Sequence, residues 1–217
     1  KHGRREMLEW CDKAYDHVQE LDKEFSDWLC VPRSVRTTSI KPSGTVSLLN
    51  GSTPGIHYPE AEYYIRRIRF SVGNVILKAI EEAGYHVEKD AYSPNTMVAS
   101  FPVHEPFFQK GKSEATMWEQ LEIAAAYQHY WADNSVSVTV TFNGDEAKDI
   151  KTALEMYESR LKAVSFLRFQ ETGYEQAPYE PITKEQYEEM SKNITPIDRI
   201  ETEVQGAGTV FCDGDSC

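Results

Sequence analysis

Cysteine and long apolar runs are both scarce in this sequence. Only four cysteines occur among 217 residues, at positions 11, 30, 212 and 217, which is too few to staple a chain of this length into a disulfide-dependent fold. No apolar run approaches the roughly 18 residues that a membrane-spanning helix needs, and the basic start leads into an amphipathic stretch rather than a signal-peptide core. We therefore predict a cytoplasmic protein with no membrane segment, long enough for one core of ordinary size.

Positive charge is also in short supply. Lys and Arg total 23 against 35 Asp and Glu, a formal net charge of −12, which argues against a generic binder of nucleic acid or of an anionic membrane surface. Any nucleotide must therefore be held by a local site. Internal repeats and low-complexity segments are lacking as well, but hydrophobic periodicity fades after residue 192 and several glycines follow. We expect residues 1–192 to fold and residues 193–217 to form a flexible tail.

Helical and strand-like patterns alternate along most of the chain. Apolar residues recur at helical spacing over residues 7–29, and Gly84 stops a second helix that begins at residue 72. Thr183, with Gln186 three positions later, is typical of a capped helix start. Further helices are predicted over 114–131, 145–161 and 183–191, and strands over 35–40, 64–70, 96–101, 135–142 and 163–167. This alternation predicts an α/β architecture with parallel strands.

The clearest strand, residues 135–142, alternates apolar and hydroxyl-bearing side chains. Its apolar members are Val136, Val138, Val140 and Phe142, and serine or threonine occupies each position between them. Successive side chains of a strand point to opposite faces. In an α/β barrel the valine face would therefore lie under the helices, and the hydroxyl face would point into the lumen.

A loop at the carboxyl end of the first predicted strand has the composition of a phosphate site. If a helix begins there, unpaired backbone N–H groups, the positive end of the helix dipole and the Ser and Thr hydroxyls would surround one anion. The Pro-Ser-Gly-Thr string alone is weak evidence for a phosphate site, because its serine could simply cap a helix. The loop residues are Pro42, Ser43, Gly44, Thr45, Val46 and Ser47.

Longer strings carry a more specific resemblance, because several of them occur in one order over nearly the whole chain. They are Val-Arg-Thr-Thr-Ser-Ile-Lys-Pro-Ser-Gly-Thr-Val-Ser-Leu-Leu at 35–49, Thr-Pro-Gly-Ile-His at 53–57, Tyr-Tyr-Ile-Arg-Arg-Ile-Arg at 63–69, Tyr-Trp-Ala-Asp-Asn-Ser-Val-Ser-Val-Thr-Val at 130–140, Ser-Phe-Leu at 165–167 and Gln-Ala-Pro-Tyr-Glu at 176–180. In these strings the chain resembles the C-terminal part of the monomeric, adenosylcobalamin-dependent (class II) ribonucleoside-triphosphate reductases.

The resemblance implies both a fold and a chemistry. The chain would supply the later strands of a ten-stranded α/β barrel, and the loop at residues 42–47 would bind the phosphates of a ribonucleoside triphosphate. The whole enzyme would reduce that substrate to a 2'-deoxyribonucleotide for DNA replication, by radical chemistry that adenosylcobalamin initiates. Cobalamin contacts are expected between Val46 and Phe107 and between Phe166 and Gln205, with no individual ligand assigned.

The two tail cysteines, Cys212 and Cys217, are separated by four residues in a glycine-containing segment. Such spacing lets two thiols close a small disulfide, although an accidental pair fits the spacing too, and the neighbouring aspartates disfavour a thiolate. The Asp-Gly-Asp string between them lacks the other ligands of a calcium loop, so no metal site is predicted. The resemblance implies that this pair re-reduces the active-site disulfide and is itself reduced by thioredoxin.

Other reactive side chains have simpler interpretations. A lone histidine in a Gly/Pro loop, His57, is more typical of a hydrogen-bonded structural residue than of a cobalt ligand. Cys11 and Cys30 fall on or near the apolar stripe of the first helix and are interpreted as packing residues. Three arginines of the string at 63–69 could add positive charge for a phosphate or could form ion pairs on a strand. They are Arg66, Arg67 and Arg69.

Residues that the resemblance requires are missing from the chain. The thiyl-radical cysteine of an Asn-Pro-Cys-x-Glu motif and the second active-site cysteine pair do not occur. We therefore expect the chain alone to be inactive and to be completed by a separate polypeptide carrying the N-terminal part of the barrel. The alternative is a nonenzymatic nucleotide-binding or interaction module derived from such a reductase. A thiol oxidoreductase acting through the tail alone is disfavoured, because no Cys-x-x-Cys motif occurs.

Overall fold

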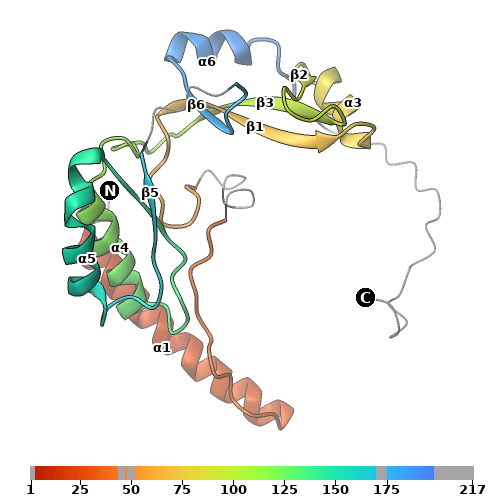
Figure 1. The fold of residues 1–217 in the computed structure, drawn as a ribbon. Coiled ribbons are helices and arrows are strands. Elements are labelled where there is room, and N and C mark those ends of the chain that lie inside the picture. Colours follow the sequence, from red (N-terminus) through yellow and green to blue (C-terminus); the bar gives the residue numbers. More distant parts are fainter. Residues whose placement is uncertain (1–2, 44–46, 48–51, 170–174, 198–217) are drawn as a thin grey trace. The chain divides into compact units, whose positions relative to one another are not determined.

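The computed structural model describes residues 3–43, 47, 52–169 and 175–197 (Figure 1). The chain divides into two compact units. The first comprises Lys1–Glu62 and His104–Gly173, and the second comprises Tyr63–Val103 and Tyr174–Cys217. The predicted tail boundary after residue 192 stays a prediction. No helix within the described ranges is long and apolar enough to cross a membrane.

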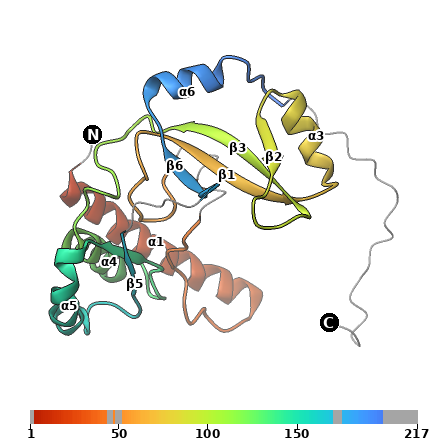
Figure 2. The same ribbon diagram turned by 45° about the horizontal axis from the view of Figure 1, so that its top comes forward.

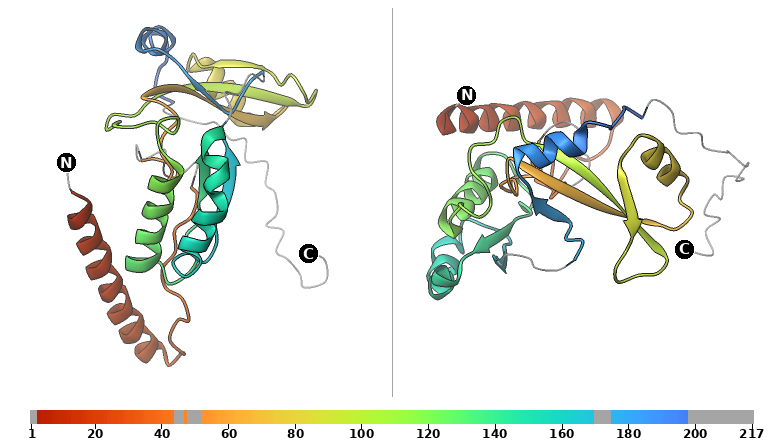
Figure 3. Two further views of the ribbon diagram at one scale, coloured as in Figure 1. Left: turned by 60° about the vertical axis from the view of Figure 1, so that its left-hand side comes forward. Right: turned by 90° about the horizontal axis from the view of Figure 1, so that it is seen from above.

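The first unit contains a layer of three α-helices. They are α1 (Arg4–Leu29), α4 (Met117–Tyr130) and α5 (Ile150–Tyr157). Helix α1 packs against α4, and α4 packs against α5 (Figure 3). A capping box starts α4, because the Thr116 hydroxyl accepts the N–H of Glu119 and the Glu119 carboxylate accepts the N–H of Thr116. The predicted helix 145–161 is divided into a 3-10 turn, η1 (Gly144–Asp149), and α5.

The strands of the first unit run parallel, as predicted. Strand β4 (Thr139–Phe142) pairs with β5 (Ser165–Arg168), and Ile40 forms a single parallel bridge to Val136. The strands predicted over residues 35–40 and 135–142 are shorter than expected, because residues 35–39 and 135–138 belong to no named strand. The reason is that side chains take over hydrogen bonds of the ladder, since the N–H of Val136 donates to the Gln128 side chain at 3.2 Å.

The core of the first unit lies between β4 and the helices. The prediction for the valine face is confirmed, because Val136, Val138 and Val140 are buried against Met117 and Leu121 of α4 and against residues of α5. Alternation of side chains therefore orients the strand. The serines and the threonine at positions 135, 137 and 139 are only partly buried on the opposite face.

The second unit is built on an antiparallel sheet, which corrects the prediction of parallel strands throughout. Its strands are β1 (Tyr63–Ser71), β2 (His86–Lys89), β3 (Thr96–His104) and β6 (Tyr179–Pro181), in the order β2-β3-β1-β6 (Figure 2). Strand β2 pairs antiparallel with β3, and β1 pairs antiparallel with β6. The short link between β2 and β3 allows a hairpin, whereas a parallel pair would need a longer crossover.

Two short helices pack within the second unit. They are α3 (Val75–Glu82) and α6 (Lys184–Ser191), and the predicted cap of α6 by Thr183 and Gln186 is confirmed. The ring of Tyr187 on α6 lies 5.2 Å from that of Tyr63 on β1. Gly84 follows α3 at a φ of +90°, and a Cβ there would lie 2.4 Å from the carbonyl oxygen of Asn193. A left-handed backbone and a close approach both require glycine at this position.

Candidate functional site

Three backbone N–H groups at alternate positions, in β4 and in the segment just before it, each have a different acceptor. The N–H of Ser137 donates to the carbonyl of Ile40 at 3.1 Å. The N–H of Thr139 donates to Nε2 of His57 at 3.0 Å, and the N–H of Thr141 donates to Oε1 of Gln120 at 2.9 Å. Beyond Ile40 the neighbouring segment diverges from β4, and the side chains of His57 and Gln120 accept the backbone N–H groups that it leaves without a partner.

His57 is a structural residue, as the sequence indicated. Its Nδ1 lies 2.7 Å from the carbonyl oxygen of Pro54, and its Nε2 accepts the N–H of Thr139. Because a carbonyl can only accept, Nδ1 carries the proton and Nε2 is the acceptor. Both ring nitrogens are therefore engaged, and neither is left to coordinate a metal.

The predicted phosphate loop begins directly after the strand segment that pairs with β4. The Ser43 hydroxyl accepts the N–H of Ser47 at 3.2 Å, and the Ser47 hydroxyl donates to the Ser43 carbonyl. Ser43 thus makes the capping contact that was its simpler interpretation, but its own hydroxyl proton has no acceptor among the described residues. Pro42 is described too, whereas Gly44, Thr45 and Val46 lie outside the described residues.

A cavity of about 230 Å³ adjoins the start of this loop. Lys41 and Pro42 line it, together with the serines of two neighbouring segments, at positions 135 and 137 of one and 165 of the other. An ammonium group and several hydroxyls on one wall can donate hydrogen bonds to an anion. Lys41 was not singled out from the sequence, although its place before Pro-Ser-Gly was a usable signal.

Asp133 fixes the strand segment that leads into the loop. Its carboxylate accepts the N–H groups of Thr37 and Thr38, at 3.1–3.2 Å, and the Thr37 hydroxyl at 3.1 Å. Burial alone would raise the pKa of Asp133, but these hydrogen bonds outweigh it, and the pKa lies below its ordinary value. The ionised carboxylate therefore ties residues 37–38 to the turn after α4.

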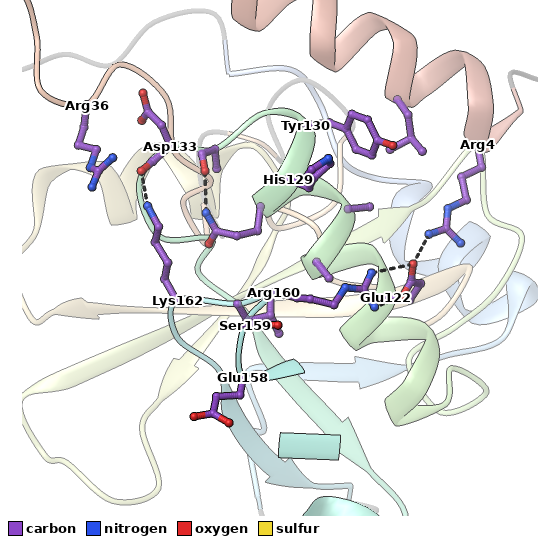
Figure 4. Close-up of a pocket in the computed structure, with 16 residues that line it drawn as sticks. Arg4, Arg36, Glu122, His129, Tyr130, Asp133, Glu158, Ser159, Arg160 and Lys162 are labelled. Carbon is purple, nitrogen blue, oxygen red and sulfur yellow. Dashed lines mark hydrogen bonds and ion pairs between the residues drawn. The ribbon is translucent and has the colours of Figure 1, made fainter. Parts of the chain in front are cut away.

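A larger cavity, of about 800 Å³, lies between α1, α4 and residues 158–162, away from the loop (Figure 4). Its charged groups are largely committed to one another: Arg4 and Arg160 both bind the carboxylate of Glu122, at 2.8 and 2.9 Å. Lys162 donates to the backbone carbonyl of Asp133. None of the residues predicted for a site lines this cavity, and its ion pairs indicate a structural role.

The three arginines of the second unit form ion pairs and carbonyl contacts, which confirms the simpler interpretation of that cluster. Arg69 binds the Asp90 carboxylate at 2.6 Å, and Arg67 binds the Glu180 carboxylate at 2.5 Å. The guanidinium of Arg66 lies 4.3 Å from the centre of the Tyr179 ring. The cluster donates to the carbonyls of residues 176, 177 and 178, and so holds the segment that leads into β6.

The cysteines have separate outcomes. Cys212 and Cys217 lie outside the described residues. Cys11 is partly buried, and burial raises the pKa of its thiol, in keeping with a packing role. The packing interpretation of Cys30 is wrong, because this residue is exposed and ends α1 in a left-handed conformation at a φ of +54°. Within the described ranges, no group of three or more His, Cys, Asp or Glu residues could hold a metal ion.

Comparison with a solved structure defines the class of fold. The crystal structure of a B12-dependent (class II) ribonucleotide reductase matches 90% of this chain with a TM-score of 0.80 and 34% sequence identity. The match covers 28% of that protein. No family model matches the chain.

Curated relatives give the more particular assignment. The adenosylcobalamin-dependent ribonucleoside-triphosphate reductase of Euglena gracilis is 41% identical over 99% of this chain, and that of Lactobacillus acidophilus is 36% identical over 97%. A probable reductase of the same name from Dictyostelium discoideum is 41% identical over 99%. The chain spans only 29–31% of the length of these relatives. It is homologous to the C-terminal part of adenosylcobalamin-dependent ribonucleoside-triphosphate reductases.

Proposed function

We propose that this chain supplies the substrate-phosphate loop and the redox tail of a cytoplasmic class II ribonucleotide reductase. Its partner is a polypeptide that carries the N-terminal portion of a ten-stranded barrel, and its substrate is a ribonucleoside triphosphate. The observation that carries the proposal is the position of the loop, directly after the segment that forms a parallel bridge from Ile40 to Val136, within a chain similar to these reductases over nearly all its residues. A nonenzymatic module would not require that similarity to extend into the tail.

In this proposal the loop holds the substrate by its phosphates. The Ser43 hydroxyl donates to no acceptor within the described part of the chain, and Lys41 lines the adjoining cavity. A charge-assisted hydrogen bond to a phosphate is about twice as strong as a neutral one. The loop thus positions the ribose without taking part in bond breaking, because the radical cysteine is not in this chain.

The tail would return electrons after each turnover. The Cys212 and Cys217 thiols pass two electrons and two protons to the oxidised active-site pair, and a disulfide forms between them. Thioredoxin then reduces that disulfide by the same exchange. The cycle balances, because each deoxyribonucleotide formed consumes one reduced dithiol.

Adenosylcobalamin is the cofactor of the assembled enzyme in this proposal, and when bound it supplies the initiating radical. His57 has no ring nitrogen to spare, and the cavities described above are lined by residues outside the two expected ranges. We therefore assign no cobalamin ligand and no step through the cofactor to this chain.

Complementation tests the proposal. The chain is co-expressed with a polypeptide corresponding to the first two thirds of the relatives, and cobalamin-dependent formation of deoxyribonucleoside triphosphates is measured. We expect product only when both polypeptides are present. The double variant Cys212→Ser, Cys217→Ser should retain turnover with a small dithiol and lose it with thioredoxin. Absence of any activity while both parts are folded and associated would contradict the proposal.

A further inference from the structure

The turn at residues 54–57 occupies the place where the strand segment ending at Ile40 leaves β4. In a parallel ladder that continued in register, the carbonyl of Pro42 would accept the N–H of Thr139. The chain diverges instead, and Nε2 of His57 accepts that N–H at 3.0 Å. The turn therefore replaces the strand at the position where the phosphate loop begins.

Gly55 brings the same turn against the base of the loop. Its φ is +61°, and a Cβ on this residue would lie 2.7 Å from the carbonyl oxygen of Lys41 and 3.5 Å from the Cα of Pro42. Real Cβ atoms do not approach a backbone oxygen this closely. Only glycine combines the left-handed backbone with this contact, so the backbone of the turn lies directly on residues 41–42.

His57 attaches the other side of the turn to β4. Its Nδ1–H donates to the carbonyl of Pro54 at 2.7 Å, and the backbone N–H of His57 donates to the same carbonyl at 3.2 Å. These bonds hold the ring so that Nε2 faces Thr139. The turn is thus in contact with the base of the loop through Gly55 and hydrogen-bonded to the sheet through His57.

We propose that Gly55 and His57 are positioning residues for the substrate phosphates. The proposal rests on the function proposed above for the loop at residues 42–47. The turn sets the distance between the backbone at residues 41–42 and the edge of β4 at Thr139. If either contact is lost, the loop base shifts, and groups that bind phosphate lose their alignment while the remainder of the nucleotide site is unaffected.

Equilibrium binding to the complex of this chain with the N-terminal polypeptide tests this proposal, with CTP and cytidine as probes. The quantity of interest is the ratio of the two affinities, because it isolates the phosphate contribution from general effects on the fold. His57→Phe keeps a ring but removes both hydrogen bonds, and Gly55→Ala adds the clashing Cβ. We expect each variant to lower the preference for CTP about tenfold, the effect of losing one well-aligned buried hydrogen bond.

Two further variants separate positioning from folding. His57→Gln retains an acceptor that can reach the N–H of Thr139, and it should restore most of the preference for CTP. Gln120→Leu removes the neighbouring acceptor on the same edge of β4, at Thr141, without touching residues 41–42. This variant should lose stability but keep the ratio of the wild-type complex.

Each result decides between the two proposals. If the wild-type complex prefers CTP and both His57→Phe and Gly55→Ala keep that preference, the positioning role is wrong and the phosphate loop stands. If Gln120→Leu lowers the ratio as much as they do, the effect is general destabilisation, and the positioning role is again wrong. If the wild-type complex shows no preference for CTP over cytidine, the proposed function of the loop fails, and the positioning role fails with it.

Discussion

Replacing Gln120 by leucine should destabilise the first unit strongly. The Gln120 amide accepts the N–H of Thr141 at 2.9 Å and its hydroxyl at 3.1 Å, and donates to the carbonyl of Thr141 at 2.8 Å. Thr141 is only 4% exposed, so water cannot replace these bonds. Leaving a buried polar group without a partner costs about 1–3 kcal/mol, and at least two backbone groups of Thr141 would be left so.

The net effect can be estimated from these terms. Two unsatisfied groups cost about 2–6 kcal/mol, and the apolar leucine side chain offsets about 1 kcal/mol of that sum. A loss of about 3 kcal/mol is large against the roughly 5–15 kcal/mol of a typical domain. With a urea dependence of about 2 kcal/mol per molar, the unfolding midpoint should fall by about 1.5 M.

The assay is urea unfolding followed by circular dichroism, with Gln109→Leu as the matched control. Gln109 is exposed and lies outside the helices and strands, so the same chemical change there should alter stability by no more than about 0.5 kcal/mol. Equal midpoints for the two variants would refute the reasoning, because they would mean that the β4 edge does not depend on the Gln120 side chain.

Three further predictions concern stability. The pKa of Glu122 is lowered from 4.5 to about 2, first by its hydrogen bond with Arg160, with Arg4 and Tyr157 adding to the effect against the opposing influence of burial. The stabilisation from this carboxylate should be complete above pH 4.5 and lost as the pH falls toward 2. If the unfolding midpoint of Glu122→Gln changes with pH as that of the wild type does throughout this window, the prediction is wrong. Gly84→Ala should lower the free energy of unfolding by about 1 kcal/mol or more beyond the loss caused by Gly73→Ala, measured by thermal unfolding. Both residues have a positive φ, but only at position 84 would a Cβ meet backbone, at Asn193. Equal losses in the two variants would show that this clash does not contribute. Thr116→Ala should destabilise α4 by about 1 kcal/mol through loss of the capping box, measured by the same urea titration, and an unchanged midpoint would show that the cap is dispensable.

Local patterns predicted much of the first unit and one helix start of the second. Strict alternation over residues 135–142 was sufficient to place the valines against the helices, because the period of a strand determines which face each side chain occupies. The cap of α6 by Thr183 and Gln186 was equally local, since all its atoms lie within one turn of helix. The loop at 42–47 was expected after a strand over residues 35–40, of which only the parallel bridge at Ile40 is present, and its role in phosphate binding stays a prediction.

Contacts distant in sequence escaped prediction. The bond between His57 and Thr139 joins residues 82 positions apart, and nothing in either segment alone indicates the other. Strands β2 and β6 are only four and three residues long, too short for a periodic signal, so the antiparallel sheet of the second unit was missed. Cys30 followed an apolar stripe, but the helix ends there and leaves it exposed. The requirement for glycine at position 55 comes from its close approach to Lys41 in the folded chain, which the sequence alone does not show.

Replacement of a segment within a relative tests whether this chain can act as the C-terminal part of such a reductase. The C-terminal segment of the Euglena gracilis reductase that corresponds to this chain is exchanged for it, and adenosylcobalamin-dependent formation of deoxyribonucleoside triphosphates is measured with thioredoxin as reductant. We predict a functional chimera whose activity disappears with Ser43→Ala combined with Lys41→Ala, because the phosphates lose the donors of these two side chains. A chimera that folds and binds cobalamin but forms no product would contradict the account.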